Sequence, residues 1–432
     1  MNKPTKINSS RPADFISTDR IFYLSTLLLV FSLPFDEQLS VVSLAFFGIS
    51  GLLYVMKNKE IFNRKISKLK SISFLTIYPL LSFISIIYSS NLKYAISKSE
   101  NLLFLLFVPL FLFILPQMSK KRFNFVMITF CVACFLSTGY PMMRIIRYYW
   151  NFKEITLWVI DDSLFIHRAY IGMYLVLCLF FIFTFFYNRN SGKPKIKLIT
   201  FLILFTYFFL FLVQSLPKTA LLATVFLFLL AIIYIRYEKF KIVRSLIVFI
   251  PVISLILIVA YVNVNLYLWD RSFSEGEKVY ALTHKNILEI IANSANVRFS
   301  HWANAYLAWI SEVKSFLFGY GIGDVKDVLN QFYLSNGLHK LASGNFNAHN
   351  TFLQISLATG LTGLTTFILL LVKSLHVGLK SGNGFLVFFI LLFVLCSATE
   401  SMLMRQKGVL FFAIFFGLFL FHAKNRNWKP IN

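Results

Sequence analysis

The sequence predicts an all-α protein that crosses a membrane many times. Of its 432 residues, 58% are hydrophobic and only 14% are charged, and 51 of them are Phe. The mean hydropathy is +0.71. An apolar run of about 20 residues crosses roughly 30 Å of hydrocarbon, and a helix satisfies its own backbone polar groups there. This composition is typical of a polytopic membrane protein.

About twelve apolar runs are predicted to be transmembrane helices. Each is interpreted as a helix because lipid offers no partner for free backbone groups. The first run follows Arg20 without a small-residue cleavage site, so it is expected to be a retained span. The predicted spans are residues 20–35, 38–56, 71–89, 98–116, 123–143, 168–187, 196–213, 218–236, 242–262, 350–372, 383–399 and 408–423.

The net charge of +24 could suggest a nucleic-acid partner. When the connecting loops are assigned alternately to the two sides, however, most Lys and Arg fall on one side and most Asp and Glu on the other. The basic loops include residues 57–70, 120–122 and 236–244. This bias follows the positive-inside rule, so both termini are expected to be cytoplasmic and no nucleic-acid partner is indicated.

The predicted topology divides the chain into an N-terminal bundle (1–262), a large extracytoplasmic loop (263–349) and C-terminal helices (350–432).

Within the predicted loop, residues 297–315 carry Phe, Trp, Ala and Tyr at helical spacing. They indicate an amphipathic helix on the outer leaflet or over the bundle. Residues 318–324 are glycine-rich without a preceding strand. We therefore expect a tight turn where side chains would clash, not a nucleotide site.

No metal or disulfide pattern stands out. The four cysteines, Cys131, Cys134, Cys178 and Cys396, all fall within apolar spans. The acidic pairs Asp161–Asp162 and Asp324/Asp327 lack accompanying histidines and are interpreted as solvated turns. A metal-independent protein without a cofactor is expected.

Three motifs follow one another in the second half of the chain. They are Arg298-Phe-Ser-His301-Trp302-Ala303-Asn304-Ala305, then Gly319-Tyr320-Gly321-Ile322-Gly323, then Ala348-His349-Asn350-Thr351-Phe352-Leu353 with Gly360 and Gly363. In this order and spacing they resemble the signature region of the O-antigen ligase and O-antigen polymerase superfamily. The resemblance covers the topology throughout and the motifs over residues 214–364. Many members carry a glutamate immediately before the glycine that is Gly360 here, where this chain has Thr359.

The resemblance implies a glycosyltransferase of a bacterial inner membrane with about twelve helices and a periplasmic active site. Its donor would be a glycan on undecaprenyl diphosphate, and no nucleotide is needed because this sugar is already activated. A ligase would use lipid A-core as the acceptor. A polymerase would use the next lipid-linked repeat unit and could work with a chain-length regulator. A transporter or flippase is less favoured, because the centres of the predicted spans are nearly free of charge.

Transfer from a diphosphate needs a base for the acceptor hydroxyl. His349 is the candidate, because the positive end of the following helix dipole favours a neutral imidazole that can accept a proton. The alternative is a histidine that caps or packs at the interface. Asn350 and His301 are expected to support the site, His301 because it shares a helical face with Arg298 three residues away. For His301, simple interfacial packing remains open.

The diphosphate also needs cations. Arg298 is the first candidate, because its planar fork grips phosphate oxygens bidentately. Arg168 and Lys218 stand at the mouths of the sixth and eighth predicted spans. The resemblance places an arginine where Lys218 stands, so the charge is kept and the fork is lost. Side chains that reach lipid phosphates are the alternative for both, and a solvated loop arginine is the alternative for Arg298.

Overall fold

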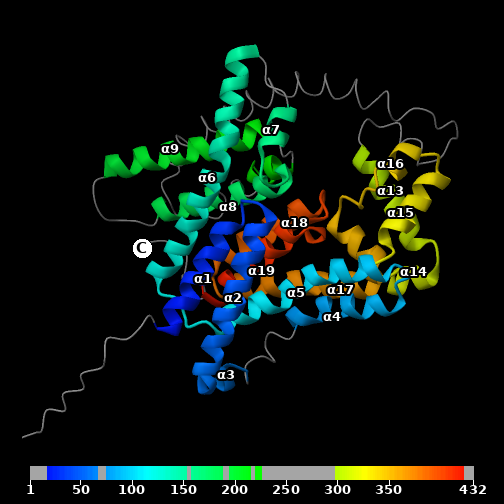
Figure 1. Cartoon of the computed structure of the whole chain (residues 1–432), viewed down its shortest axis with the longest axis horizontal. Coiled ribbons are helices and arrows are strands. Elements are labelled where there is room, and N and C mark those ends of the chain that lie inside the picture. Colours follow the sequence, from blue (N-terminus) through cyan, green and yellow to red (C-terminus); the bar gives the residue numbers. More distant parts are fainter. Residues whose placement is uncertain are drawn as a thin grey trace, which may run out of the picture.

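The computed structural model describes residues 17–66, 74–152, 157–187, 194–215, 219–225 and 297–422, and within them every regular element is a helix (Figure 1). The first group comprises α1 (Thr18–Ser32), α2 (Glu37–Lys57), α3 (Lys59–Ile66), α4 (Phe74–Ile84), η2 (Ser85–Tyr88), α5 (Leu92–Ile114), α6 (Lys120–Phe152), α7 (Leu157–Ser163), α8 (Arg168–Tyr187) and α9 (Pro194–Gln214). The second comprises α13 (Val297–Ile310), α14 (Val313–Phe318), α15 (Val325–Ser335), α16 (His339–Ser343), α17 (Thr351–Lys380), α18 (Gly384–Ser397), η3 (Met402–Met404) and α19 (Gln406–His422).

The core of the bundle is built around α8 and α19, which are apolar on all sides. Both helices are buried along most of their length. Aromatic pairs join them to their neighbours: the ring centroids lie 4.5 Å apart for Tyr174 and Phe411, and 3.6 Å apart for Phe180 and Phe388. A helix that is hydrophobic all round must be covered on every side, which explains the central position of both.

The helices around this core expose apolar side chains. On α2, for example, Val42, Ile49 and Met56 follow at seven-residue intervals and are 65%, 58% and 67% exposed. In a protein that crosses a membrane, such a stripe is the surface that meets lipid tails, where apolar contact carries no penalty.

Five described helices are long and apolar enough to cross a membrane: Glu37–Lys57, Leu92–Ile114, Lys120–Phe152, Arg168–Phe185 and Thr351–Lys380. Three shorter apolar helices accompany them: Ile199–Gln214, Gly384–Ser397 and Gln406–His422. Over the described residues these findings confirm an all-helical fold with several helices long and apolar enough to cross a membrane. The total of about twelve stays a prediction, because the span at 242–262 and most of the span at 218–236 lie outside the described residues.

The predicted large loop is described from residue 297 onward, and residues 263–296 lie outside the description. Its described part folds into α13, α14, α15 and α16, which gather at the end of the bundle where α17 begins (Figure 1). The helix predicted over 297–315 ends at Ile310, and the chain then turns into α14.

The glycine-rich turn and α17 fit into each other. Helix α17 is interrupted at Gly360, whose φ is 64° and ψ −161°. One turn earlier, the carbonyl of Leu357 accepts from the backbone N–H of Tyr320 at 2.8 Å, and that of Ala358 from Gly321 at 3.0 Å. A Cβ on Gly360 would collide with the backbone of Leu317. Within the turn itself, a Cβ on Gly319 would collide with the backbone of Ala358, and one on Gly323 with that of Asn91, so the predicted tight turn without room for side chains at its glycines is confirmed.

The same turn is also hydrogen-bonded to η2 and to the segment between η2 and α5. The hydroxyl of Ser85 accepts from the N–H of Ile322 at 3.2 Å, and the hydroxyl of Ser89 accepts from Gly323 at 3.1 Å. The carboxylate of Asp324 accepts from the N–H groups of Ser90 and Asn91, at 2.7 and 2.8 Å, just before α5 begins. Asp324 thus satisfies free donors at a helix start, a role that the sequence did not predict.

Candidate active site

His349 lies immediately before α17, and its backbone is held in an unusual conformation. Its φ is 45°, which a non-glycine residue adopts at a cost of about 1–3 kcal/mol. Its N–H donates to Oδ1 of Asn347 at 2.9 Å, and its carbonyl accepts from the indole N–H of Trp302 at 3.1 Å. Asn350 then caps the helix by accepting from the N–H of Phe352 at 2.9 Å. The imidazole is therefore aimed by its own backbone.

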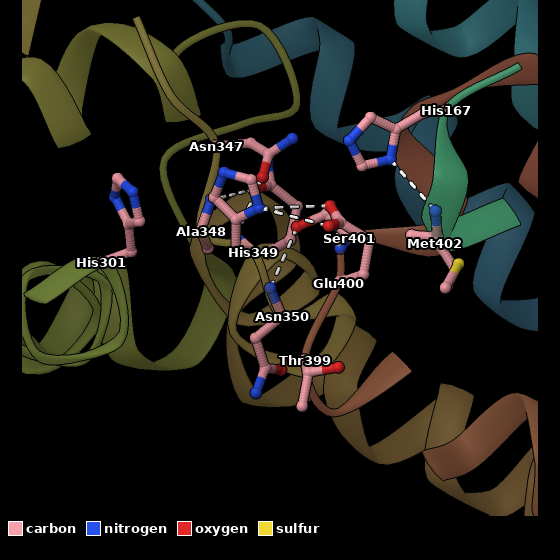
Figure 2. A network of polar contacts seen from close by, with 12 residues as sticks. His167, His301, Asn347, Ala348, His349, Asn350, Thr399, Glu400, Ser401 and Met402 are labelled. Carbon is pink, nitrogen blue, oxygen red and sulfur yellow. Dashed lines mark hydrogen bonds and ion pairs between the residues drawn. The ribbon is translucent and has the colours of Figure 1, made fainter. Parts of the chain in front are cut away.

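The imidazole faces a buried carboxylate from a different part of the chain (Figure 2). The Nδ1 atom of His349 lies 3.3 Å from Oε1 and 3.4 Å from Oε2 of Glu400, in the segment between α18 and α19. The side chain of His349 is 26% exposed and that of Glu400 is 9% exposed. Because a carboxylate holds the proton of a neutral imidazole on Nδ1, the lone pair is left on Nε2.

The segment that carries Glu400 is fastened to the start of α17. The hydroxyl of Thr351 donates to the carbonyl of Glu400 at 2.8 Å. Asn350 contributes two bonds: its N–H donates to the hydroxyl of Ser401 at 3.1 Å, and its side-chain amide donates to the carbonyl of Ala398 at 2.9 Å. Asn350 thus both caps α17 and positions the Glu400 segment, and its supporting role in the site stays a prediction.

His301 packs against the other side of His349, with the two ring centroids 4.9 Å apart. It is buried, and its Nδ1 lies 2.7 Å from the hydroxyl of Tyr333. Burial, assisted by the electrostatic effects of His349 and Arg298, lowers the pKa of His301 to about 3, although the negative charge of Glu400 opposes the shift. His301 is therefore a neutral packing partner of the site.

The charge of Glu400 is set by opposing effects. Burial acts to raise the pKa of Glu400, but the hydrogen bond with His349 and the electrostatic effects of His349, His167 and Arg298 together hold it below its ordinary value. The carboxylate is therefore ionised at neutral pH. Burial also lowers the pKa of His167; Glu400 and Asp161 oppose this, whereas Arg405 and Arg168 add to it.

Of the predicted cations, Arg298 acts electrostatically on this pair. Arg298 lies one helical turn before His301 on α13, close enough to influence both His301 and Glu400. Arg168, at the start of α8, has its Nε 3.6 Å from Oδ1 of Asp161, while its Nη1 is buried without a hydrogen-bond partner. Lys218 lies outside the described residues.

Sequence reasoning missed Glu400, which is one member of the pair, and it also missed His167 and Arg405. Glu400 gave a usable signal, because it is an acid at the end of an apolar span in a chain with only 18 acidic residues. Its partnership with His349, 51 residues earlier, follows only from the packing of the loop on α17. His167 directly precedes Arg168 but had no motif around it.

The two acidic residues at the end of α7 are paired with arginines: Asp162 lies 2.8 Å from Arg144, and Asp161 lies 3.6 Å from Arg168. Among the described residues, no group of three His, Cys, Asp or Glu side chains could hold a metal ion. Metal independence itself remains a prediction.

These observations define an all-helical, multi-pass membrane protein with a His–Glu pair at the start of a long membrane helix. Residues 201–368 match the model of the O-antigen ligase family, and this match supports the resemblance to the O-antigen ligase/polymerase superfamily. The match includes His349, His301 and Arg298, whereas Arg168 and Glu400 lie outside it. No curated protein matched the chain.

Proposed function

We propose that the protein is a glycosyltransferase of the O-antigen ligase type. It transfers a glycan from undecaprenyl diphosphate to a sugar hydroxyl of lipid A-core, on the periplasmic face of a bacterial inner membrane. The family supports a lipid-linked glycan as the substrate class. The observation that carries the proposal is the geometry of His349, whose Nδ1 faces a buried carboxylate while its Nε2 keeps a lone pair for a substrate proton.

In the proposed reaction, Nε2 of His349 takes the proton of the acceptor hydroxyl as the oxygen attacks the anomeric carbon of the donor. The bond between this carbon and the diphosphate oxygen breaks, and the diphosphate leaves with the bonding electrons. Glu400 stabilises the imidazolium that forms. A positioned base of this kind typically contributes about 10²–10⁴ in rate.

Cations hold the diphosphate while its charge grows. We assign this role to Arg298, Arg168 and Lys218, and we assign Arg298 to catalysis as well because its positive charge acts on Glu400. The buried and unpartnered Nη1 of Arg168 supports its assignment, since a buried guanidinium donor requires an acceptor. For Lys218 the argument rests on the resemblance alone.

The transporter alternative would use a broken helix near the middle of the membrane, where free carbonyl groups can coordinate an ion. Helix α17 is broken at Gly360, but the carbonyls of Leu357 and Ala358 already accept from the glycine-rich turn. The break therefore supports a structural joint more than a transport site.

The first experiment replaces His349 in cells that make normal amounts of the protein. We expect His349→Ala to abolish the attachment of glycan or the elongation of the glycan chain. His376→Ala, which replaces a histidine in the distal half of α17, should leave both intact. Unchanged glycan in the His349→Ala strain would contradict the proposal.

Gene disruption then separates the two acceptors. Loss of all polymeric glycan on lipopolysaccharide, with lipid-linked polymer still present, identifies a ligase. Attachment of single repeat units identifies a polymerase that acts on lipid-linked acceptors, and co-purification of a chain-length regulator would support that second assignment.

A further inference from the structure

Helix α13 has its polar side inward and its apolar side outward. The buried residues are small or polar: Ser300, His301, Asn304, Ala305 and Ala308. On the opposite side, Phe299, Tyr306 and Ile310 are 43%, 49% and 41% exposed. At 100° per residue the two sets lie on opposite faces of the helix. A helix on a water-soluble surface would show the reverse pattern.

The exposed apolar face continues beyond α13. On α14, Val313 and Phe318 are 77% and 53% exposed. The carbonyl of Phe318 accepts from the hydroxyl of Tyr88 at 2.7 Å, which joins α14 to the end of α4 and η2. There, Ile84 and Ile87 are 53% and 83% exposed. We call the five residues Phe299, Tyr306, Ile310, Val313 and Phe318 the apolar rim.

We propose that the apolar rim lies in the membrane, at the boundary between headgroups and acyl chains, with α13 along the membrane plane. The first argument is continuity: the rim adjoins Ile84 and Ile87 at the end of α4, on the outside of a bundle that crosses the membrane. The second is direction: in Figure 1, α13 lies across the end of the bundle at which α17 begins. An exposed apolar patch of this extent requires a partner, and lipid is already at its edge.

The residues that flank the rim fit the same depth. Trp302 and Trp309 present their rings beside it, and their indole N–H groups donate to the carbonyls of His349 and Phe316. Glu312 and Lys314 are exposed next to Val313. Tryptophan and charged residues beside apolar side chains that enter the lipid are typical of a helix at the membrane–water interface.

If the apolar rim lies in lipid, the thickness of α13 sets the distance between the lipid and the candidate site. The meaning of this distance for a substrate rests on the proposed function. The polar face of α13 carries His301, whose ring packs on His349. The diameter of a helix is about 10 Å, so His349 would stand about one helix from the lipid boundary. A diphosphate anchored by a polyprenyl chain would reach the site at that depth without leaving the membrane.

The test uses single cysteines at Tyr306, Ile310 and Val313, labelled with bimane in lipid nanodiscs. Gln331→Cys, an exposed polar position on α15, is the matched control, and the labelled parent chain corrects for its own cysteines, of which Cys134, Cys178 and Cys396 are buried and Cys131 half-buried. We expect quenching by aqueous iodide to be several-fold weaker at the rim than at Gln331→Cys. Quenching by lipids with a doxyl group near the headgroup should be several-fold stronger at the rim.

Two results would overturn the inference. Iodide quenching at the rim equal to that at Gln331→Cys would place the rim in water. Protection from both iodide and doxyl lipid would place it under protein. Because the measurement needs no catalysis, its failure leaves the proposed transferase to be judged separately by the His349→Ala strain.

Discussion

At the scale of single residues, the candidate site is centred on the imidazole of His349. The residues that contact this imidazole are brought to it by the packing of separate segments of the chain. His349 could be selected from the sequence because a motif surrounds it and an apolar span follows it. The partnership of Glu400 with His349 could not be predicted, because it depends on how the Ala398–Met402 segment is bonded to Asn350 and Thr351. Sequence reasoning thus found the candidate base and missed the group that orients it.

Replacement of Glu400 by Gln should slow the reaction without weakening donor binding. The amide no longer carries the charge that stabilises an imidazolium, and by analogy with the partners that orient metal-ligating histidines the expected contribution is about 10–100-fold. We therefore expect kcat to fall about 10–100-fold with KM for the lipid-linked donor nearly unchanged, and Glu400→Asp to restore part of the rate. Reconstituted enzyme with a lipid-linked donor provides the measurement. Glu312→Gln, an exposed acid at the start of α14, is the control; equal rates in both variants would refute a positioning role.

His301 should make the protein acid-sensitive. Its pKa is lowered to about 3 in the fold, whereas an unfolded histidine titrates near 6.5. The unfolded state therefore binds more protons below pH 6.5, so stability present at pH 7 is lost as the pH falls towards 3. At pH 5 the loss is about 2 kcal/mol, from 1.36 kcal/mol per pH unit. His301→Gln, which can still bond Tyr333, should lose less melting temperature between pH 7.5 and 5 than the parent. An identical loss in both proteins would show that His301 does not titrate this way.

At the scale of elements, the joint between the glycine-rich turn and α17 is what places the candidate site. The sequence predicted a tight turn at 318–324 and an apolar span at 350–372 as separate features. Their contact was not predictable, because a hydrogen bond between Tyr320 and Leu357 has no local signature. The break at Gly360 is likewise hidden, since an isolated glycine in an apolar helix is common.

Alanine at Gly360 should weaken this joint. An alanine at positive φ costs about 1–2 kcal/mol, and the new Cβ would also collide with the backbone of Leu317, which cannot move aside as a flexible side chain can. We expect a lower melting temperature and a loss of transfer activity. Gly139→Ala, in the middle of α6 with nothing within 4 Å of its Cβ, is the matched control and should be neutral or slightly stabilising. A Gly360→Ala protein as stable and active as the control would show that the joint tolerates a side chain.

At the scale of the whole molecule, composition alone identified the class. Hydropathy placed α2, α5 and α8 within several residues of their observed ends, because lipid requires a minimum length of apolar helix. The fold of residues 297–349 into four short helices was harder to predict from the sequence, because these helices are stabilised by packing on one another and on α17. The division of the chain at residues 262 and 349 remains a prediction.

The orientation of the whole molecule in the membrane gives a last prediction. Basic residues between 57 and 70 should keep α3 in the cytoplasm, and an odd number of crossings should place α15 on the periplasmic side with His349. A membrane-impermeant maleimide should therefore label Gln331→Cys in cells whose outer membrane has been permeabilised, and label Asn63→Cys, an exposed position on α3, only after lysis. The parent chain, with its cysteines in apolar spans, supplies the background. The opposite pattern would put His349 in the cytoplasm, where a base could not reach an acceptor displayed on the periplasmic leaflet, and the proposed transfer would be excluded.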